Sequence, residues 1–325
     1  MTEKKDKTNK TVQIAILARV YGNVNADETI GNRTTIKKFY SSEGEVLPFV
    51  SARAIKYAIR EALKNEGFEI DPFVNDTKNL NDNKEQNDKK NMGNKNLNDS
   101  GDPIKYIDND LFGYMVTIKG SRKGEGGSLS RQAPVAISYF KALKNTPIVT
   151  EFGGRFPRNK DDNPQPFEVE VADFIGRLNV LIYDYIGKFK EDELKKDQKD
   201  QLQKNRDYYE LDRNKREERI KKFLEVLLTP KYVLPRRTNS LNVPEYKIAV
   251  VVLNNKGVLP VYQYLDYKEQ GIVDTEKLKK LVEICKKLES RVLVIDYDNW
   301  LKENIDDIEK VDVNKAIEEI TNHLL

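Results

Sequence analysis

Residues 11–20, TVQIAILARV, contain the pattern on which the fold prediction depends. Apolar side chains recur there at every second position, which is the period of a β-strand. The recurring positions are Val12, Ile14, Ile16, Ala18 and Val20. The most β-branched run in the chain, YKIAVVVL at residues 246–253, has the composition of a buried strand. These two runs predict a β-sheet in which residues 246–253 form a central strand.

Outward from these runs, helical and strand periods continue along the chain. Helices are expected over residues 51–66, 275–290 and 314–325, and strands over residues 110–119, 168–182 and 291–297. Residues 21–31 have the Gly, Asn and Asp content of a long loop. The core order of strand, helix, two strands, helix and strand predicts an α+β sheet with helices on one face and long insertions.

Four segments do not fit that core. Residues 75–102 are almost entirely Asn, Asp, Lys, Gln and Gly, which predicts a disordered segment. The Gly-rich stretch GSRKGEGGSLS at 120–130 is expected to be a flexible loop. Apolar stretches interrupted by Gly and Pro at 144–167 predict a projecting hairpin. Residues 188–228 are dominated by charge and predict one or two helices with a solvated face.

The composition excludes several classes of site and of protein. The chain has 325 residues with a single Cys and a single His, so an internal disulfide framework, zinc clusters and a two-histidine ribonuclease centre are excluded. The longest aliphatic run, Ile248–Leu253, is far shorter than the ~18 residues of a membrane helix. The N-terminus is polar and unlike a signal peptide, so the protein is expected to be cytoplasmic. The chain is also expected to form one elaborated domain.

The formal net charge of +3 hides a gradient along the chain. Residues 19–60 carry seven basic and four acidic side chains, and residues 104–160 carry ten basic and four acidic ones. From residue 266 to the end there are ten basic and fifteen acidic side chains. The gradient favours a polyanion-binding N-terminal half and an acidic end that contacts another protein. A lysine-rich solvated surface would explain the same charge runs.

The helix expected over residues 51–66 carries the clearest binding signal. At about 100° per residue, Arg53, Lys56, Arg60 and Lys64 share one stripe opposite the apolar side chains. Ser51 is a favourable N-cap, and the free N–H groups at a helix start favour a phosphate. The helix is therefore interpreted as a phosphate-binding face. The alternative is an ordinary amphipathic helix whose polar side is basic.

Other basic side chains suggest further contacts with a polyanion. The Gly-rich loop contains or is flanked by Arg122, Lys123 and Arg131. It has no nucleotide-binding fingerprint. It could act as a clamp on a nucleic-acid backbone or be a plain disordered connection. Arg236 and Arg237 form a third basic point. Aromatic side chains are interleaved with these cations, as base stacking requires, although most aromatics are expected in the core. They include Phe39, Tyr40, Phe152 and Phe156.

Candidates for catalysis are poor. His323 is expected at the surface, and Cys285 lies on the apolar side of its helix, as a buried small hydrophobe does. Asp27 and Asp108 lie near strand ends, where carboxylates bind divalent ions but more often serve turns and caps. Trp300 is expected to be a packing residue.

Four pieces of the sequence, in order, resemble a known family. They are NVNADETIGNRTTIKKF (residues 23–39), LPFVSARAIKYAIREAL (47–63), DNDLFGYMVTIKG (108–120) and, after the Gly-rich loop, SRQAPVAISYF (130–140). They resemble the Cas-seven superfamily of the CRISPR-associated RAMP proteins, most closely its DevR-like members in type I-B Cascade complexes. The resemblance spans most of residues 11–185 and is weaker over the C-terminal third.

The resemblance implies an RRM-like, ferredoxin-like palm in which insertions form fingers (67–110) and a thumb-like hairpin (144–167). It implies a non-enzymatic backbone subunit without a cofactor or metal. Its expected partners are CRISPR guide RNA, copies of itself in a helical filament, other Cascade subunits and, once assembled, target DNA, with no membrane. The RNA-binding residues expected are Asn25, Arg33, Lys37, Lys38, Ser51, Arg53, Lys56, Arg60, Arg122, Lys123, Arg131, Phe152, Arg155, Arg236 and Arg237.

Two other function classes stay open at the sequence level. One is a metal-dependent ribonuclease of the same fold, using an aspartate such as Asp27 or Asp108, or a CRISPR RNA processing enzyme. The single His makes acid and base catalysis awkward, although Tyr and Lys can substitute. The other is a protein-interaction scaffold that binds no nucleic acid.

Overall fold

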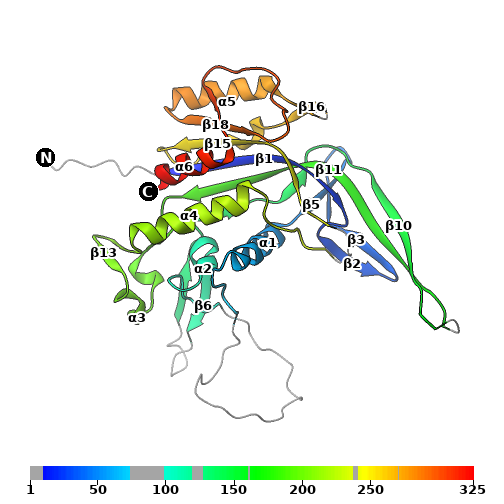
Figure 1. Cartoon of the computed structure of the whole chain (residues 1–325), viewed down its shortest axis with the longest axis horizontal. Helices are drawn as coiled ribbons and strands as arrows, with labels where there is room; N and C mark the ends of the chain where they lie inside the picture. The colour runs from blue at the N-terminus through cyan, green and yellow to red at the C-terminus, as the bar shows by residue number, and fades with distance from the viewer. Residues whose placement is uncertain (1–9, 74–98, 119–126, 160–161, 237–240, 270) are drawn as a thin grey trace, which may run out of the picture. The chain divides into compact units, whose positions relative to one another are not determined.

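A computed structural model describes residues 10–73, 99–118, 127–159, 162–236, 241–269 and 271–325 (Figure 1). The chain divides into two compact units. The larger unit comprises residues 1–63, 135–184 and 220–325, and the smaller one residues 64–134 and 185–219. The smaller unit is thus built from two separate insertions in the larger one.

The larger unit is organised around one sheet of twelve strands. Their bounds are β1 (Thr11–Gly22), β2 (Ala26–Ile30), β3 (Arg33–Ile36), β4 (Lys38–Tyr40), β5 (Val46–Val50), β8 (Val135–Ile137), β9 (Phe140–Ala142), β10 (Ile148–Arg155), β11 (Gln165–Tyr183), β15 (Glu245–Asn254), β18 (Arg291–Asp296) and β19 (Ile308–Lys310). The main path runs β19-β18-β15-β1-β11-β9-β5-β4. β1 pairs antiparallel with β11 on one side and with β15 on the other.

Helices lie on both faces of this sheet. They are α1 (Ala52–Asn65), α5 (Thr275–Lys287), α6 (Val313–Leu324) and α4 (Arg213–Leu228), of which the residues from Ile220 on belong to the larger unit. The larger unit also contains η2 (Tyr262–Tyr264) with the short strands β16 (Tyr267–Glu269) and β17 (Ile272–Val273). Figure 1 shows α1 and α4 on one side of the sheet and α5 on the other. Only a sheet buried on both faces explains why β1 is apolar on both sides, with Ala15 and Leu17 as buried as Ile14 and Ile16.

The face toward α5 buries a continuous apolar cluster. Leu17 of β1 and Val250 of β15 belong to the same buried cluster as Leu281 and Cys285 of α5, and the cluster also includes Trp300. Burial raises the pKa of the Cys285 thiol to about 11, as expected for a packing residue. The predictions that Cys285 is buried and that Trp300 packs in the core are both confirmed.

β11 is the longest strand, and its first half extends the sheet into an arm. Residues 165–172 of β11 pair antiparallel with β10, forming a hairpin that overlaps the expected range 144–167 and extends beyond its end to residue 172. Glu168 and Val169 also pair in parallel with β3, which brings the β2–β3 hairpin alongside. At Gly153 an added Cβ would lie 2.6 Å from the ring of Phe167. The absence of a side chain at Gly153 lets that ring cross the neighbouring strand closely.

The smaller unit contains short elements. They are α2 (Ile107–Phe112), β6 (Tyr114–Ile118), β7 (Gly127–Arg131), β12 (Lys188–Phe189), η1 (Glu191–Glu193), α3 (Lys196–Lys199), β13 (Gln203–Asn205) and β14 (Tyr208–Glu210). β6 and β7 form a hairpin, and β12, β14 and β13 form a three-stranded sheet. Its apolar cluster is small and centres on Phe189, Leu194 and Leu211.

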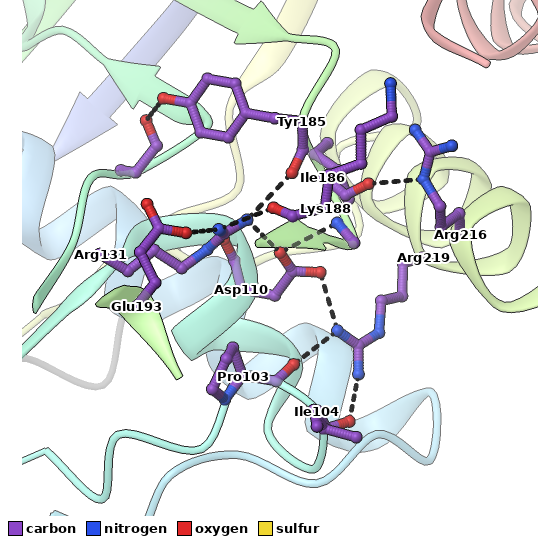
Figure 2. A network of polar contacts seen from close by, with 12 residues as sticks. Pro103, Ile104, Asp110, Arg131, Tyr185, Ile186, Lys188, Glu193, Arg216 and Arg219 are labelled. Carbon is purple, nitrogen blue, oxygen red and sulfur yellow. Dashed lines mark hydrogen bonds and ion pairs between the residues drawn. The ribbon is translucent and has the colours of Figure 1, made fainter. Parts of the chain in front are cut away.

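A buried ionic cluster holds the two insertions of the smaller unit together (Figure 2). The Asp110 carboxylate accepts from Arg131 Nη2 and from Arg219 Nη1, each at 2.7 Å. Arg131 Nη1 donates to Glu193 at 2.7 Å and to the Lys188 carbonyl at 2.9 Å. Because the side chains of Asp110 and Arg131 are fully buried, each charge is compensated by its partners and not by water.

A second cluster in this unit, around Asp71, holds residues 73 and 100 together. The Asp71 carboxylate accepts from the backbone N–H of Phe73 at 2.9 Å and from that of Ser100 at 2.7 Å. Asn109 Nδ2 also donates to Asp71, at 2.8 Å. Residues 73 and 100 are therefore fixed by one side chain.

Most of the predicted elements are confirmed. The strands at 11–20, 168–182, 246–253 and 291–297 and the helices at 51–66, 275–290 and 314–325 appear with small shifts at their ends. No helix in the described ranges is long and apolar enough to cross a membrane.

Several boundaries were wrong. Part of the loop expected at 21–31 is β2, and residues 107–112 form α2 where a strand was expected from residue 110. In the segment 188–228, α4 begins only at Arg213, because a three-stranded sheet and two short helices precede it. The expected disorder at 75–102 falls mostly outside the described residues. Its last residues are ordered, because Ser100 is bound to Asp71 and the Gly101 carbonyl to Gln198.

Candidate nucleic-acid interface

The helix α1 has the two faces that its sequence predicts. Its buried side chains are the five apolar ones expected: Ile55, Ala58, Ile59, Ala62 and Leu63. On the opposite stripe, Arg53 and Lys64 are exposed and Lys56 and Arg60 are half-buried. The helix is thus anchored through one face while its cations remain at the surface.

The start of α1 is capped as expected. Ser51 Oγ accepts from the backbone N–H of Ala54 at 3.2 Å, and the Ser51 carbonyl accepts from Ile55 at 3.1 Å. The remaining N–H groups of the first turn carry the positive end of the helix dipole, which favours an anion. Burial, and then the positive charge of Arg60, lower the pKa of the Lys56 ammonium. A phosphate bound between these cations would relieve their repulsion.

The stripe on α1 includes an aromatic residue that the sequence reasoning missed. Tyr57 lies about 40° from Arg53 at the usual helical period, at the edge of the stripe and next to the direction of Lys64. Its side chain is 56% exposed. Helical spacing was the signal that could have revealed it, because Tyr57 follows Arg53 by four residues and precedes Arg60 by three. An exposed ring among cations supplies a stacking surface for a base.

Backbone contacts bring three other predicted positions near the start of α1. The Lys37 N–H donates to the Asn25 carbonyl at 3.4 Å, and the Phe49 N–H donates to the Lys37 carbonyl at 3.1 Å. The Asn25 N–H donates to the Pro235 carbonyl, and Val24 pairs with Arg236. Since α1 follows directly after β5, these contacts gather Asn25, Lys37 and Arg236 beside its N-terminal end.

Asn25 itself has a structural role. Its side chain is buried, and its Nδ2 donates to the Phe49 carbonyl at 3.4 Å. Its backbone has φ of 52°, in the left-handed region that Asn tolerates better than most residues. Asn25 therefore shapes the turn beside α1, with its amide directed at the protein backbone, and its expected contact with RNA stays a prediction.

Three further predicted cations are paired with carboxylates. Arg33 Nε lies 2.5 Å from Glu168, and Lys38 Nζ lies 3.1 Å from Glu170. Lys37 Nζ lies 3.1 Å from Asp27. The groove along β2, β3 and β11 is lined by four acidic residues but only two basic ones, Arg33 and Lys38. Arg33, Lys37 and Lys38 therefore lie on a surface without excess positive charge, whereas the stripe on α1 is positively charged.

The β10–β11 hairpin presents the predicted Phe152 and Arg155 to solvent. The Phe152 side chain is 76% exposed, and that of the neighbouring Phe156 is 80% exposed. Arg155 is also exposed. Large apolar rings exposed on a hairpin are costly to leave in water and mark a contact surface.

Arg131 does not belong to a surface site. Its guanidinium is fully buried in the ionic cluster with Asp110 and Glu193 (Figure 2). Its planar group also lies 4.5 Å from the centre of the Phe189 ring. The prediction that Arg131 contacts RNA was therefore wrong, because all of its charge is used inside the protein. Arg122, Lys123 and Arg237 lie outside the described residues.

The acidic candidates for a nuclease have structural partners. Asp108 is fully buried and accepts from the Asp71 N–H at 3.0 Å, and Asp27 is paired with Lys37. Over the described residues there is no group of three or more His, Cys, Asp or Glu side chains placed to hold a metal ion. His323 is half-buried with Nε2 3.1 Å from the Asn254 carbonyl, which corrects its expected surface position.

Comparison with solved structures shows the class of fold. A chain from a structure described as "CRISPR RNA-guided surveillance complex, pre-nicking" superposes with a TM-score of 0.59 at 11% identity, covering 97% of this chain and 100% of that chain. A chain from a "CRISPR RNA-guided surveillance complex" gives a TM-score of 0.54 at 12% identity, covering 95% of this chain and 99% of that one. The mixed α and β fold is therefore shared with chains of such complexes along nearly its whole length.

The family follows from the sequence itself. The model of the family described as "CRISPR-associated negative auto-regulator DevR/Csa2" matches residues 16–270. Because this match spans well over half of the chain, the chain belongs to the DevR/Csa2 family, as its resemblance to DevR-like proteins predicted. A comparison with curated protein sequences finds no significant match.

Proposed function

We propose that this chain is a backbone subunit of a type I CRISPR surveillance complex of the I-B kind. Copies would polymerise along a guide RNA in the cytoplasm, join other Cascade subunits, and present the RNA for pairing with target DNA in antiviral defence. The subunit would bind without cleaving and without a cofactor. The observation that carries this proposal is DevR/Csa2 family membership together with a fold shared with surveillance-complex chains.

The sheet topology supports an RRM-like palm within this proposal. β15, β1, β11 and then β8 and β9 are neighbours in the sheet, and all of these pairs are antiparallel. Along the chain, α1 lies between β1 and β8, and α4 lies between β11 and β15. This is the order of a ferredoxin-like βαββαβ unit with both helices on one face of the sheet.

The stripe on α1 is the proposed grip on the RNA backbone. Arg53, Lys56, Arg60 and Lys64 offer several positive charges along one helix face, next to capped N–H groups. Contacts of this kind bind phosphates and carry no sequence information, as suits a subunit that must accept any guide. Arg236 extends this surface, and Arg122, Lys123 and Arg237 stay in the proposal from their sequence alone.

The β10–β11 hairpin is the proposed thumb. It exposes two phenylalanine rings, that of Phe152 within β10 and that of Phe156 just after the strand, with Arg155 between them in the sequence. Rings of this kind insert between stacked bases and displace one of them, while the arginine holds the adjacent phosphate.

The central test is the salt dependence of RNA binding by the Arg53→Ala, Lys56→Ala, Arg60→Ala triple variant. For single strands, the logarithm of affinity falls with the logarithm of salt by about 0.7 per neutralised phosphate. If the three cations each contact a phosphate, the slope should flatten by about 2, with a loss of affinity of at least tenfold at low salt. Fluorescence anisotropy of a labelled guide RNA measures both quantities.

A matched control removes three positive charges from another helix. Lys279, Lys280 and Lys287 are exposed on α5, far along the chain from the stripe. Their replacement by Ala changes the net charge equally and should leave the slope nearly unchanged. Equal effects of the two triple variants would show that binding depends on net charge alone. The proposed function would be rejected if wild-type protein purifies without RNA and does not bind RNA at low salt. Magnesium-dependent cleavage of bound RNA would show that the subunit is an enzyme.

Tyr57 supplies a second prediction for the same surface. Tyr57→Ala should weaken RNA binding by about 1–3 kcal/mol, because a base loses its stacking partner. Tyr57→Phe should bind normally, since the ring is kept. Both variants should keep the salt slope of the wild type, because no phosphate contact is removed. Binding isotherms at several salt concentrations separate this stacking effect from the charge effect, and a normal affinity for Tyr57→Ala would exclude a role for the ring.

A further inference from the structure

A groove on the larger unit, distinct from the stripe on α1, has the features of a second binding site. We call it the sheet-face groove. It has a volume of about 520 Å³ and lies over β4, β5, β9 and β11. It is lined by Phe39, Tyr40, Ser41, Leu47, Ser138, Tyr139, Lys141, Leu143, Arg177 and Asn179.

The register of the strands explains how this groove is built. Arg177 of β11 is paired with Lys141 of β9, and Lys141 is paired with Phe49 of β5. Directly paired residues point to the same face of a sheet, so the three side chains form a row across neighbouring strands. This is the face of Ile175, which belongs to the α5 cluster, and the opposite face carries Leu178.

One end of the groove is aromatic. Phe39 stacks on Phe49 with ring centres 4.1 Å apart and an interplanar angle of 17°. Tyr139 meets both rings edge-on, at 5.6 Å and 5.2 Å. Tyr139 remains 51% exposed, and Tyr40 is exposed beside it. A ligand ring therefore finds rigid aromatic surfaces here that are already held in place by one another.

An interruption between β8 and β9 places Tyr139 in this position. β8 ends at Ile137 and β9 begins at Phe140, and both strands pair with β11. Between them, Ser138 exchanges two hydrogen bonds with Asn179, through its N–H at 2.9 Å and its Oγ at 3.0 Å. Irregularities of this kind in a sheet redirect a side chain and often lie at binding sites.

The other end of the groove has two polar atoms without partners. Arg177 Nη1 donates to the Leu265 carbonyl at 2.8 Å, but Nε makes no hydrogen bond. The buried Oδ1 of Asn179 likewise has no partner. A buried donor and a buried acceptor left unpaired each cost about 1–3 kcal/mol, so a ligand that satisfies both gains that energy.

These features identify the chemistry of the ligand. The two free atoms need an acceptor and a donor, both of which the edge of a nucleobase provides, whereas a phosphate provides acceptors. The lining residues include two cations, Lys141 and Arg177, and no acid, which favours a phosphorylated ligand over a peptide segment. We propose that the sheet-face groove binds an unpaired nucleobase, stacked against Tyr139 and Phe39 and hydrogen-bonded by Arg177 and Asn179, with its phosphate near Lys141.

This proposal extends the proposed function but does not depend on it, because the groove shares no residue with α1. The base could belong to a free nucleotide or to a single-stranded nucleic acid. Either source uses the same stacking surface, and the two are distinguished by comparing 2-aminopurine riboside 5′-monophosphate with a short single-stranded RNA that carries one 2-aminopurine. The fluorescence of 2-aminopurine is quenched when the base stacks on an aromatic ring.

The experiment titrates the full-length protein into each probe and compares four variants. Tyr139→Leu and Asn179→Leu should each weaken binding at least tenfold, and Tyr139→Leu should also abolish the quenching of whatever remains bound. Tyr139→Phe should behave as wild type. Tyr21→Leu is the matched control, because Tyr21 is 52% exposed but lies outside the groove. Circular dichroism melts confirm that each variant is folded.

The outcomes separate this proposal from the proposed function. Quenching that survives in the Arg53→Ala, Lys56→Ala, Arg60→Ala variant and disappears in Tyr139→Leu supports the groove even if guide RNA binding fails. Guide RNA binding with no quenching of either probe, or equal losses in Tyr139→Leu and Tyr21→Leu, overturns the groove and leaves the α1 interface intact. Hydrogen exchange of the backbone amides in the groove is also measured without a probe. If these amides become protected only at high protein concentration, the groove is a contact between copies of the chain, and the nucleobase assignment is overturned.

Discussion

The two compact units bury different kinds of side chains. In the larger unit, β1, β15 and α5 bury a continuous apolar cluster that includes Leu17 and Trp300. In the smaller unit the apolar cluster is small, and a carboxylate, Asp110, is shared by the guanidinium groups of Arg131 and Arg219. Apolar contacts are individually weak and tolerate adjustment, whereas a buried charge depends on each of its partners. The smaller unit should therefore be the more sensitive to single substitutions.

The difference follows from size and shape. The smaller unit consists of residues 64–134 and 185–219, from which 74–98 and 119–126 are not described, and its strands are short. Short elements bury little apolar surface, so polar contacts have to supply part of the specificity. Because the Arg131 guanidinium also donates to the carbonyls of Tyr185 and Lys188, the cluster fixes backbone as well as side chains.

The largest effect is expected for Asp110→Ala. Removing this carboxylate leaves Arg131 and Arg219 buried without their shared partner, which typically costs about 3–5 kcal/mol. Hydrogen exchange of the β6 and β7 amides should accelerate by several hundredfold, because these strands belong to the destabilised unit. The unfolding transition followed by Trp300 fluorescence, which reports on the larger unit, should shift much less.

Glu193→Gln is the graded comparison for this prediction. Glu193 contacts only Arg131 in the cluster, and Arg131 keeps Asp110 as its counter-ion in that variant. The acceleration should therefore be clearly smaller than in Asp110→Ala. Equal exchange rates in the two variants would show that the cluster does not act through the shared Asp110 carboxylate.

A smaller effect, about 2–5 kcal/mol, is expected for Leu17→Ala in the apolar core. Leu17 is fully buried in the cluster that contains Trp300, and its replacement leaves a cavity. Urea unfolding followed by the fluorescence of this single Trp should show a lower midpoint with an unchanged slope. Val258→Ala, at an exposed position of the same unit, should change stability by less than about 0.5 kcal/mol. A midpoint for Leu17→Ala that matches that of Val258→Ala would contradict the two-sided burial of β1.

The same contrast explains which parts could be predicted from the sequence. The strand at 11–20 and the helices at 51–66 and 275–290 are visible because burial imposes a period on apolar residues. The ionic cluster gives no such period. Arg131 stands beside a Gly-rich loop and looks like a surface cation, and Arg219 lies within a charged run, so neither indicates that it is buried against Asp110.

The candidate interface shows the same limit. Arg53, Lys56 and Arg60 could be placed on one face, because helix geometry fixes their directions from local sequence alone. The pairing of Arg33 with Glu168 and of Lys38 with Glu170 joins residues more than 130 positions apart, through the parallel contact of β3 with β11. The sheet-face groove depends on the register of several strands, which local patterns do not specify.

The smallest effect is expected for an ion pair at the surface of the larger unit. Arg19 donates to both oxygens of Asp173, at 2.8 Å and 2.6 Å, and this pairing lowers the pKa of the Asp173 carboxyl below its ordinary value near 3.8. A carboxyl whose pKa is lower in the folded state stabilises the protein above its unfolded pKa and loses that contribution as the pH falls through the folded value. Because both side chains are largely exposed, the contribution should stay below about 1 kcal/mol.

Asp173→Asn isolates this pair from the buried cluster. At pH 7 the variant should be less stable than wild type by under about 1 kcal/mol, and the gap should close as the pH falls well below 3.8, where the wild-type carboxyl is also neutral. At high salt the gap should shrink further, since exposed charges are screened. Urea midpoints at pH 7 and pH 3, each at low and high salt, measure these changes. If Asp173→Asn lowers the free energy of unfolding as much as Asp110→Ala does, solvent exposure does not determine the strength of an ion pair in this protein.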